Sequence, residues 1–250
     1  MFKGKTVIIS GGAGDIGLAA ALKFAELGAN IAIGDIKPKE EVEDLLEKVV
    51  ACGVNCHYKQ IDIANAEVAY NWVEEVSSLL GIPTIIIANA AITRLSGFSD
   101  ITAEQWVNDM NVNVNGAFFL TKYATDRLLK HGLEGRVVFV GSWAATHIHS
   151  HMPAYSVSKA AIHMLNKCMA LELAPKGILV NEIAPGYVDA GLSGRIWNEN
   201  PDRRERATGR IPTKQVITAA EVAEQIVFLC DPKNRHMVGS TLLMDGGLSL

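Results

Sequence analysis

Short runs of aliphatic and β-branched residues recur along the 250-residue chain, and several are apolar throughout instead of alternating with polar residues. Such runs are typical of parallel strands that are covered on both faces of a sheet. Longer segments with helical periodicity separate them, and this alternation favours right-handed strand–helix–strand crossovers. The expected strands are residues 6–9, 31–33, 84–87, 136–140, 178–183 and 241–244, and the expected helices include residues 18–27, 39–50, 67–80, 103–130 and 154–173. The sequence therefore predicts an α/β fold with a single doubly wound parallel sheet and helices on both faces.

Composition limits the number of domains and the class of partner. Hydrophobic residues make up 49% of the chain and charged residues 20%, and the formal net charge is −4. A chain of this kind can bury a sizeable core, and no linker, repeat or low-complexity tract divides it. We therefore expect one domain over residues 1–250. The net charge gives no reason to expect a nucleic-acid partner or an anionic membrane surface.

The sequence also indicates a compartment. It lacks a stretch of about 20 uninterrupted apolar residues, and its first apolar run leads directly into glycines, unlike a signal peptide. The cysteines have no matching cluster of metal ligands, so we expect free thiols in a reducing compartment; they are Cys52, Cys56, Cys168 and Cys230. We predict a cytoplasmic protein without a membrane span.

A glycine-rich segment, SGGAGDIGLA at residues 10–19, follows the first expected strand and opens a helix. Glycines let the backbone turn tightly and approach a pyrophosphate, whose charge a helix N-terminus favours. Asp35 ends the second expected strand, eighteen residues after Gly17. Its carboxylate can accept both hydroxyls of an adenosine ribose, whereas a 2′-phosphate there would be repelled. Together these features predict a dinucleotide site that takes NAD rather than NADP.

A second motif is Tyr155-Ser-Val-Ser-Lys159, with Ser142 thirteen residues before the tyrosine. Four residues apart on a helix, Tyr155 and Lys159 share one face. A phenol with a pKa of about 10 is a poor acid–base group at neutral pH. A nearby ammonium lowers that pKa by favouring the phenolate. Ser142, at the end of the strand at residues 136–140, can hydrogen-bond a substrate oxygen as charge develops on it. This arrangement is typical of a catalytic site.

Taken together, the two motifs resemble the short-chain dehydrogenase/reductase family, whose usual opening is T-G-x-x-x-G-x-G. In that register Ser10 replaces the threonine, Gly11 and Gly17 match, and Asp15 replaces the middle glycine. The alternative G-x-G-x-x-G pattern, which Gly12, Gly14 and Gly17 satisfy, is then partly accidental. We expect the Asp15 side chain to cap free N–H groups at the helix start, where its charge suits the helix dipole.

The resemblance implies a Rossmann-type domain that binds NAD(P), and it implies roles for residues along most of the chain. Asn113 would hold a water that links Lys159 to solvent as a proton relay, and Lys159 would also hold the nicotinamide ribose. The residues implied in cofactor binding are Gly11, Asp15, Ile16, Gly17, Asp35, Ile36, Asp62, Ile63, Asn89, Tyr155, Lys159, Pro185, Gly186 and Val188. The implied assembly is a homotetramer, with the helices at residues 103–130 and 154–173 at one interface.

Basic and aromatic residues surround the expected substrate position. The resemblance implies a lid around residues 187–215, and arginines in it mildly favour a polar or acidic substrate. The candidate substrate contacts are Arg94, Trp143, His149, Tyr187 and Arg195. Three histidines alternate at residues 147, 149 and 151. Such spacing can form part of a metal site, but the predicted chemistry already has its hydrogen-bond donors, so we expect loop histidines and no metal.

These features predict an enzyme, a short-chain alcohol dehydrogenase or carbonyl reductase that uses NAD to interconvert a secondary alcohol and a ketone. Sugars, polyols and hydroxy acids are the expected substrates, and Tyr155 would take or give the hydroxyl proton. One alternative is an NADPH-dependent 3-oxoacyl-thioester reductase, because its relatives often carry Ile-Thr-Arg as at residues 92–94; Asp35 argues against it. Another is a dinucleotide-sensing protein without catalysis, against which the Ser142, Tyr155 and Lys159 set argues.

Overall fold

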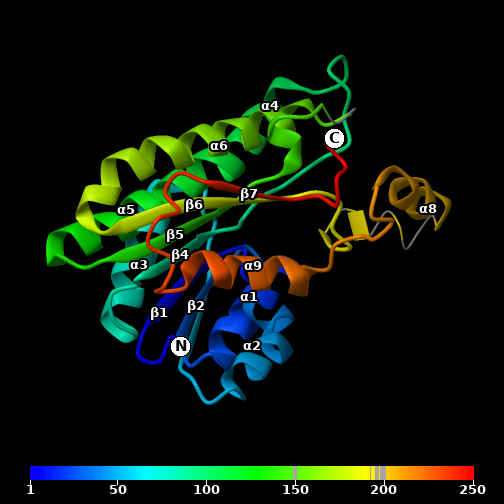
Figure 1. The fold of residues 1–250 in the computed structure, drawn as a ribbon. Helices are drawn as coiled ribbons and strands as arrows, with labels where there is room; N and C mark the ends of the chain where they lie inside the picture. Colours follow the sequence, from blue (N-terminus) through cyan, green and yellow to red (C-terminus); the bar gives the residue numbers. More distant parts are fainter. Residues whose placement is uncertain (149–150, 192, 195–196, 198–200) are drawn as a thin grey trace.

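The computed structural model describes residues 1–148, 151–191, 193–194, 197 and 201–250, and its centre is a parallel sheet (Figure 1). The seven strands lie in the order β3-β2-β1-β4-β5-β6-β7, and every neighbouring pair is parallel. Their bounds are β1 Thr6–Ser10, β2 Asn30–Asp35, β3 Cys56–Gln60, β4 Ile85–Ala88, β5 Gly135–Val140, β6 Ile178–Pro185 and β7 Thr241–Met244. The predicted doubly wound parallel sheet is confirmed.

Burial explains which strands the sequence reveals. All residues of β1, β4 and β6 are buried because helices cover both faces, and most of these residues are apolar. The strand β3 is different: its sequence, CHYKQ, is partly exposed over its whole length. It pairs only with β2 at the edge of the sheet. An edge strand of this kind lacks the continuous apolar run by which the other strands were predicted.

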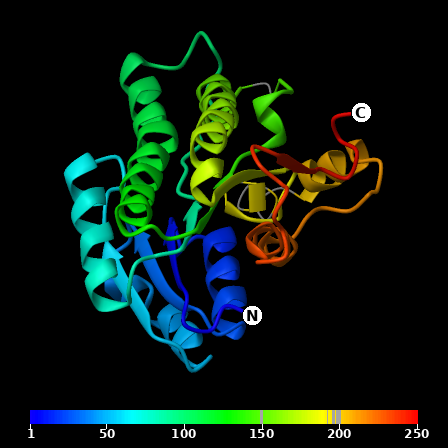
Figure 2. The same ribbon diagram turned by 60° about the vertical axis from the view of Figure 1, so that its left-hand side comes forward.

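Helices pack on both faces of the sheet (Figure 1, Figure 2). Helices α1 (Asp15–Glu26), α2 (Glu43–Val50) and α9 (Ala219–Cys230) contribute to one apolar core. Helices α3 (Ala66–Leu79), α5 (Ala117–His131) and α6 (Pro153–Leu173) contribute to the core on the opposite face. Trp72 and Phe24 are among the largest fully buried side chains, one in each core, and such side chains anchor the two helical layers to the sheet.

Local sequence signals fix where several helices begin. Asn65 caps α3, and its side chain accepts from the backbone of Glu67 and Val68. Capping boxes open α9, with Thr218 and Glu221, and α4 (Ala103–Met110), with Thr102 and Gln105. Each box satisfies two backbone donors at the start of a helix.

Between α4 and α5 the helix widens into a π-helical segment, Asn111–Gly116. The flanking residues Met110 and Ala117 keep right-handed helical angles, so α4, the π segment and α5 run on without a break. Such π turns are rare and frequently occur at functional sites. Here the segment contains Asn113.

The remaining elements lie near the ends of β5 and β6 or in surface connections. They are the short helices η1 (Lys39–Glu41), η3 (Trp143–Ala145) and η4 (Ala174–Lys176), and α8 (Pro201–Arg210). Figure 1 shows α8 standing away from the sheet, beyond the ends of β6 and β7. Among the described residues, no helix has the length and apolar character needed to span a membrane.

Candidate active site

The predicted site residues gather along the edge of the sheet where its parallel strands end. In the strand order, β1 lies between β2 and β4, so the connections that leave β1 and β4 turn to opposite faces. Open parallel sheets bind ligands at such a switch point, outside the carboxyl ends of the strands. The glycine-rich turn follows β1, Asp35 ends β2, Asn89 follows β4, Ser142 follows β5 and Gly186 follows β6.

The glycine-rich turn is packed too closely for side chains. Gly11 has φ +63°, and a Cβ on Gly17 would lie 2.3 Å from the Gly11 oxygen and 2.9 Å from Nδ2 of Asn89. Asn89 holds the turn by donating from Nδ2 to the carbonyls of Gly11 at 2.9 Å and Ser10 at 3.1 Å. These contacts require glycine at positions 11 and 17. They also show that Asn89, which follows β4, holds the glycine-rich turn in place.

The start of α1 suits the pyrophosphate of a dinucleotide. Gly14 is the N-cap, and among the described residues no side chain caps this helix. The N–H groups of its first turn, which include those of Ile16 and Gly17, therefore remain available to an anion. A narrow glycine cradle at an uncapped helix N-terminus fits a dinucleotide, so the residues present fit the cofactor that the sequence predicts.

Asp15 does not cap the helix, contrary to the expectation from sequence. Its Oδ2 accepts the backbone N–H of Gly191 at 2.6 Å, which joins the start of α1 to the segment that follows β6. The acid therefore acts between two distant parts of the chain.

Asp35 is fixed at the end of β2 and is only 9% exposed. Its Oδ2 accepts the N–H of Ala13 at 3.0 Å and its Oδ1 that of Lys37 at 3.2 Å. Lys37 in turn donates from Nζ to the Ala13 carbonyl at 3.1 Å. The carboxylate is thus placed beside the glycine-rich turn, where the sequence predicts the adenosine ribose. The neighbouring Ile36 leaves 69% of its surface exposed.

Two further predicted cofactor residues lie after β3. Asp62 accepts the N–H of Ala64 at 3.0 Å, while Ile63 is buried. A Cβ on Gly116 would lie 2.7 Å from Cγ2 of Ile63, so Ile63 packs directly on the π segment.

Ser142, Tyr155 and Lys159 lie together at the end of β5. Ser142 caps η3 by accepting from the backbone of Ala144 at 3.1 Å, and its side chain also hydrogen-bonds Tyr155. The Lys159 Nζ lies 5.5 Å from the centroid of the Tyr155 ring and donates to the Val140 carbonyl at 2.7 Å. One face of α6 therefore presents the phenol and the ammonium to the end of β5.

Burial dominates the electrostatics of this cluster. It raises the pKa of Tyr155, and the hydrogen bond from Ser142 acts in the opposite direction. Burial also lowers the pKa of Lys159 to about 8, against the opposing charge of Glu182. Both groups are thus less easily charged than in water, as is common for groups of a catalytic site.

Asn113 is buried in the π segment, and both hydrogens and the oxygen of its amide bond to neighbouring residues. Oδ1 accepts the N–H of Ile92 at 2.7 Å. Nδ2 donates to the Ile92 carbonyl at 2.9 Å and to Oγ of Ser158 at 3.0 Å. Ser158 in turn donates to the Tyr155 carbonyl at 2.8 Å. Asn113 therefore ties the segment after β4 to the first turns of α6, which carry the phenol and the ammonium.

The segment after β6 lies against the last strand. Gly186 donates to the Met244 carbonyl at 2.8 Å, and a Cβ on Gly186 would lie 2.8 Å from the Cα of Asp245. Pro185 is the last residue of β6, and Val188 forms a parallel bridge with Ile217. These contacts place the predicted nicotinamide-side residues at the same edge as Ser142.

Three aromatic side chains meet beside Ser142. The ring of Tyr187 lies edge-on to Trp143, with centroids 5.6 Å apart, and edge-on to Trp197, with centroids 6.2 Å apart. The ring of His147 stacks on Trp143 at 6.0 Å, and the Tyr187 hydroxyl accepts from Arg210 at 3.1 Å. Trp143 and Tyr187 were predicted to contact substrate, whereas Trp197 was missed because it lies in the polar lid segment.

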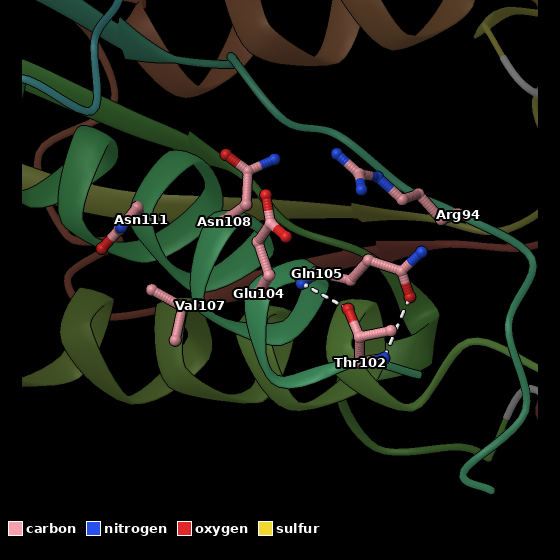
Figure 3. A pocket seen from close by; sticks show the side chains of 7 residues that line it. All are labelled: Arg94, Thr102, Glu104, Gln105, Val107, Asn108 and Asn111. Atoms are coloured by element: carbon pink, nitrogen blue, oxygen red, sulfur yellow. Dashed lines mark hydrogen bonds between the residues drawn. The ribbon is translucent and has the colours of Figure 1, made fainter. Parts of the chain in front are cut away.

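The other substrate candidates fall elsewhere. His149 and Arg195 lie outside the described residues. Arg94 is 3.8 Å from the buried carboxylate of Asp109 and lines a surface hollow of about 650 Å³ over α4 (Figure 3). Burial raises the pKa of Asp109, and the Arg94 charge opposes this shift. Arg94 thus has an acidic partner within the protein.

Helix α8 carries most of the charged side chains of the predicted lid. Arg204 forms an ion pair with Asp189, and the described arginines of α8 are exposed. Within the described ranges, no group of three or more histidine, cysteine or acidic side chains is arranged to hold a metal ion.

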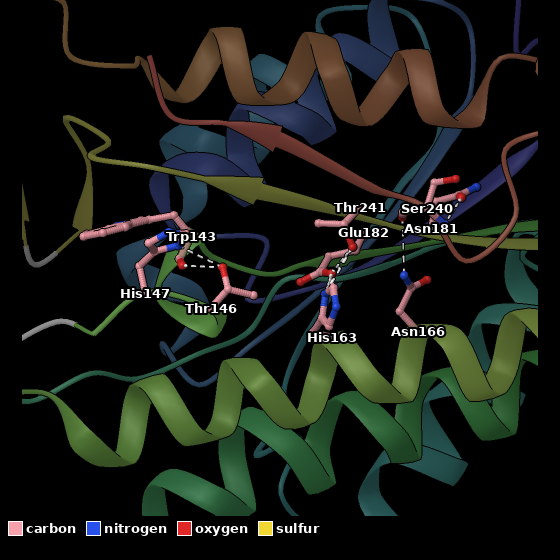
Figure 4. Close-up of polar contacts among 9 residues, drawn as sticks. All are labelled: Trp143, Thr146, His147, His163, Asn166, Asn181, Glu182, Ser240 and Thr241. Atoms are coloured by element: carbon pink, nitrogen blue, oxygen red, sulfur yellow. Dashed lines mark hydrogen bonds and ion pairs between the residues drawn. The ribbon is translucent and has the colours of Figure 1, made fainter. Parts of the chain in front are cut away.

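Sequence reasoning missed one polar group behind the site. Figure 4 shows Glu182 of β6 between His163 of α6 and Thr241 of β7. The signal was a glutamate within the otherwise nearly apolar run ILVNEIAP. Burial of a charged side chain in a central strand is uncommon unless it is paired.

Comparison with known proteins agrees with this geometry. The family model described as enoyl-(acyl carrier protein) reductase matches residues 11–249. The chain is 30% identical to L-rhamnose-1-dehydrogenase of Scheffersomyces stipitis, over 99% of this chain and 97% of that protein. It is 28% identical to 3-oxoacyl-[acyl-carrier-protein] reductase of Staphylococcus aureus, over 98% of each chain.

Solved structures give the same result. NAD⁺-bound xylitol dehydrogenase superposes with a TM-score of 0.92 at 28% identity, covering 98% of this chain and 99% of that one. A short-chain type dehydrogenase/reductase from Mycobacterium marinum superposes with a TM-score of 0.92 at 25% identity, covering 99% and 96%. With a family model over nearly the whole chain, and the sheet and site described above, the protein belongs to the short-chain dehydrogenase/reductase family of oxidoreductases.

Proposed function

We propose that this protein is an NAD-dependent dehydrogenase that interconverts a secondary alcohol and a ketone on a polar small molecule such as a sugar, polyol or hydroxy acid. The observation that carries the proposal is the cluster of Ser142, Tyr155 and Lys159. The Tyr155 phenol is hydrogen-bonded to a serine hydroxyl and has an ammonium 5.5 Å from the centroid of its ring. A phenol in this setting can exchange a proton with a substrate hydroxyl.

The proton chemistry follows from these contacts. Tyr155 Oη takes the hydroxyl proton during alcohol oxidation and returns it during ketone reduction. Ser142 Oγ donates a hydrogen bond to the substrate oxygen and stabilises negative charge on it. The positive charge of Lys159 favours the phenolate. Asn113 uses both amide hydrogens within the protein, so a relay water would bind through the second lone pair of its Oδ1.

The proposed cofactor residues follow the same edge of the sheet. The turn at Gly11 and Gly17 and the start of α1 would hold the pyrophosphate, and Asp35 would hold the adenosine ribose. The exposed side chain of Ile36 would cover the adenine, and Lys159 would donate hydrogen bonds to the nicotinamide ribose. When bound, the nicotinamide supplies the group that accepts or donates hydride. The fixed carboxylate of Asp35 supports NAD over NADP.

The substrate class rests on the surfaces near Ser142. Tyr187 is partly exposed and is backed by the buried rings of Trp143 and Trp197. It would provide an aromatic surface for the C–H groups of a sugar or polyol. Ion pairing of Arg204 with Asp189 reduces the positive charge that would select an anion. Residues 187–215 are proposed as a lid, and residues 1–250 as one domain.

Two rival activities remain open to test. The family model's description and the Staphylococcus aureus relative both name a reductase of acyl-carrier-protein substrates. The relative favours a 3-oxoacyl-thioester reductase, for which NADPH would be the cofactor. A dinucleotide-sensing protein without catalysis would keep the cofactor cradle and show no turnover.

We also propose a cytoplasmic homotetramer. Its supports are the free cysteines among the described residues and the apolar side chains exposed on α5 and α6. These include Phe118 at 41%, Met164 at 56% and Leu171 at 83%. Burial of these apolar side chains between subunits would stabilise such an assembly.

The test is a panel of sugars, polyols, hydroxy acids and a 3-oxoacyl thioester, assayed with each nicotinamide cofactor by absorbance. We expect turnover of a polar secondary alcohol with NAD, and its loss by at least about a hundredfold in Tyr155→Phe. The variant should keep its affinity for NADH. Turnover confined to the thioester with NADPH would establish the first rival, and NADH binding without any turnover would establish the second.

A further inference from the structure

Glu182 is a carboxylate in the middle of a buried strand. It is 0% exposed in β6, where it pairs in register with Phe139 of β5 and Thr241 of β7. Removing a carboxylate from water is costly unless nearby groups stabilise its charge. An apolar side chain of similar volume would fill the same space without that cost, so packing alone does not explain a glutamate here.

One oxygen of this carboxylate is held from two elements (Figure 4). Glu182 Oε2 lies 2.8 Å from Nδ1 of His163 and accepts the Thr241 hydroxyl at 2.7 Å. The Thr241 hydroxyl is also 3.2 Å from the same histidine nitrogen. These contacts fix the direction of the side chain toward α6.

The other oxygen has no such partner. Glu182 Oε1 is buried without a hydrogen bond among the described residues. It lies against Gly141, where an added Cβ would be 1.9 Å away. Glycine at position 141 therefore makes the space that this oxygen occupies, next to the peptide bond that joins Val140 to Gly141.

Lys159 binds the same peptide bond. Its Nζ donates to the Val140 carbonyl at 2.7 Å, and the residue is 4% exposed. Tyr155, Lys159 and His163 follow one another at four-residue spacing on α6, so they share one stripe of the helix. The Lys159 ammonium and the free oxygen of Glu182 therefore both approach the peptide bond between Val140 and Gly141.

We propose that Glu182 is a positioning residue that acts through Lys159: its buried carboxylate is the counter-charge that keeps the ammonium group protonated and directed at the Val140 carbonyl. The inference rests on the proposed function, because that function gives Lys159 its tasks of supporting the phenolate and holding the nicotinamide ribose. Neither the glycine motif nor the Tyr-x-x-x-Lys motif includes Glu182.

The charges that face the carboxylate support this role. Burial lowers the pKa of Lys159 to about 8, and Glu182 is the group that raises it against burial. The titratable groups of α6 along this stripe are Tyr155, Lys159 and His163, while β7 presents the Thr241 hydroxyl and β5 the Val140–Gly141 peptide. Without the carboxylate, the pKa of Lys159 would be lower still.

The experiment measures cofactor affinity, which needs no substrate. NADH binding to the full-length protein is followed by fluorescence from pH 6.5 to 10 at constant ionic strength, in the parent and in Glu182→Gln. We expect parent affinity to fall as Lys159 loses its proton. The midpoint should be lower by about one pH unit or more in the variant, the size typical of removing a close opposite charge. Thermal unfolding of both proteins checks that the fold is kept.

Three controls make the result specific to Lys159. Glu172→Gln removes an exposed acid from the same helix and should leave the midpoint unchanged. Lys159→Met should abolish the pH dependence, and Glu182→Gln added to it should have no further effect. If Glu182→Gln does not fold, Glu182→Met fills the space without charge and should give the same shift.

Equal midpoints in parent and variant, an affinity that is flat with pH in the parent, or a shift that persists without Lys159 would each overturn the proposal. A failure of the proposed function would look different: no alcohol would be turned over, while the pH midpoint of NADH binding would still differ between the parent and Glu182→Gln.

Discussion

The Asp15 carboxylate accepts the backbone N–H of Gly191 at 2.6 Å, across 176 positions of sequence. One residue thus belongs to the first turn of α1 and also holds the chain that leaves β6 toward α8. Where the family pattern has a glycine, this protein has a link between the two sides of its proposed cofactor site.

Replacing Asp15 by glycine tests that link. We expect Asp15→Gly to weaken NAD and NADP by a similar factor of about five, which corresponds to roughly 1 kcal/mol for an exposed hydrogen bond to a carboxylate. Asp15→Asn keeps an acceptor oxygen and should retain most of the affinity. Fluorescence titration with both reduced cofactors measures this. A reversal of cofactor preference in Asp15→Gly would contradict the role assigned to the link.

Asp35 should set the choice of cofactor. Its carboxylate and a 2′-phosphate about 4 Å apart would repel by about 4 kcal/mol at an effective dielectric near 20, and a third of that leaves roughly a tenfold preference. We expect kcat/KM to favour NAD in the parent and Asp35→Ala to improve NADP while weakening NAD. Lys37→Ala, which removes a nearby positive charge, should increase the preference for NAD. A parent that prefers NADP would refute the assignment.

Two glycines of the same turn form a matched pair. In Gly17→Ala the new Cβ would lie 2.3 Å from the Gly11 oxygen, whereas in Gly14→Ala its nearest neighbour is at 3.4 Å. We expect the first change to lower stability by about 1–3 kcal/mol and to abolish measurable NADH binding. The second should change either property little. Thermal unfolding and fluorescence titration compare the two, and equal effects would show that the turn adapts.

The ammonium of Lys159 should make stability depend on pH. Burial lowers its pKa from 10.5 to about 8, so between these values the unfolded chain binds a proton that the native protein lacks. Stability therefore rises with pH in this window, by up to roughly 3 kcal/mol. Urea unfolding should show that, from pH 8 to 10.5, the free energy of unfolding increases more in the parent than in Lys159→Met. Tyr58, whose pKa is raised to about 12, is present in both proteins, so its contribution cancels in the difference between their free energies of unfolding. A constant difference would contradict the shift.

Elements with strong local or repetitive signals could be predicted from sequence. The fully buried strands were found because each is a short apolar run, and the dinucleotide turn because glycines follow such a run. The strand β3 was missed, since an edge strand with the sequence CHYKQ has no apolar run. The capping box of Thr218 and Glu221 is visible in the sequence and marks the start of α9, a helix that was not among those predicted from helical periodicity.

The parts that could not be predicted depend on tertiary contacts. The bond of Asp15 to Gly191 joins residues that only the fold brings together, so local reasoning assigned the acid to a helix cap. The bonds of Asn113 to Ile92 and Ser158 require the path of the chain after β4, which local patterns in the sequence do not show. The environment of Glu182 likewise depends on which helix covers β6.

The π segment at residues 111–116 has a consequence for the length of the chain. A π turn contains one residue more than an α turn, and each residue of an α-helix turns it by about 100°. Deleting any one residue here would let the helix close regularly, but it would swing α4 around its axis and carry Asn113 away from Ile92. Apart from Asn113 and Gly116, which are buried, the segment should therefore accept changes of residue type more readily than changes in residue number. Insertions and deletions between β4 and α6 are expected to be tolerated only outside it, for instance at the left-handed Gly132 that ends α5.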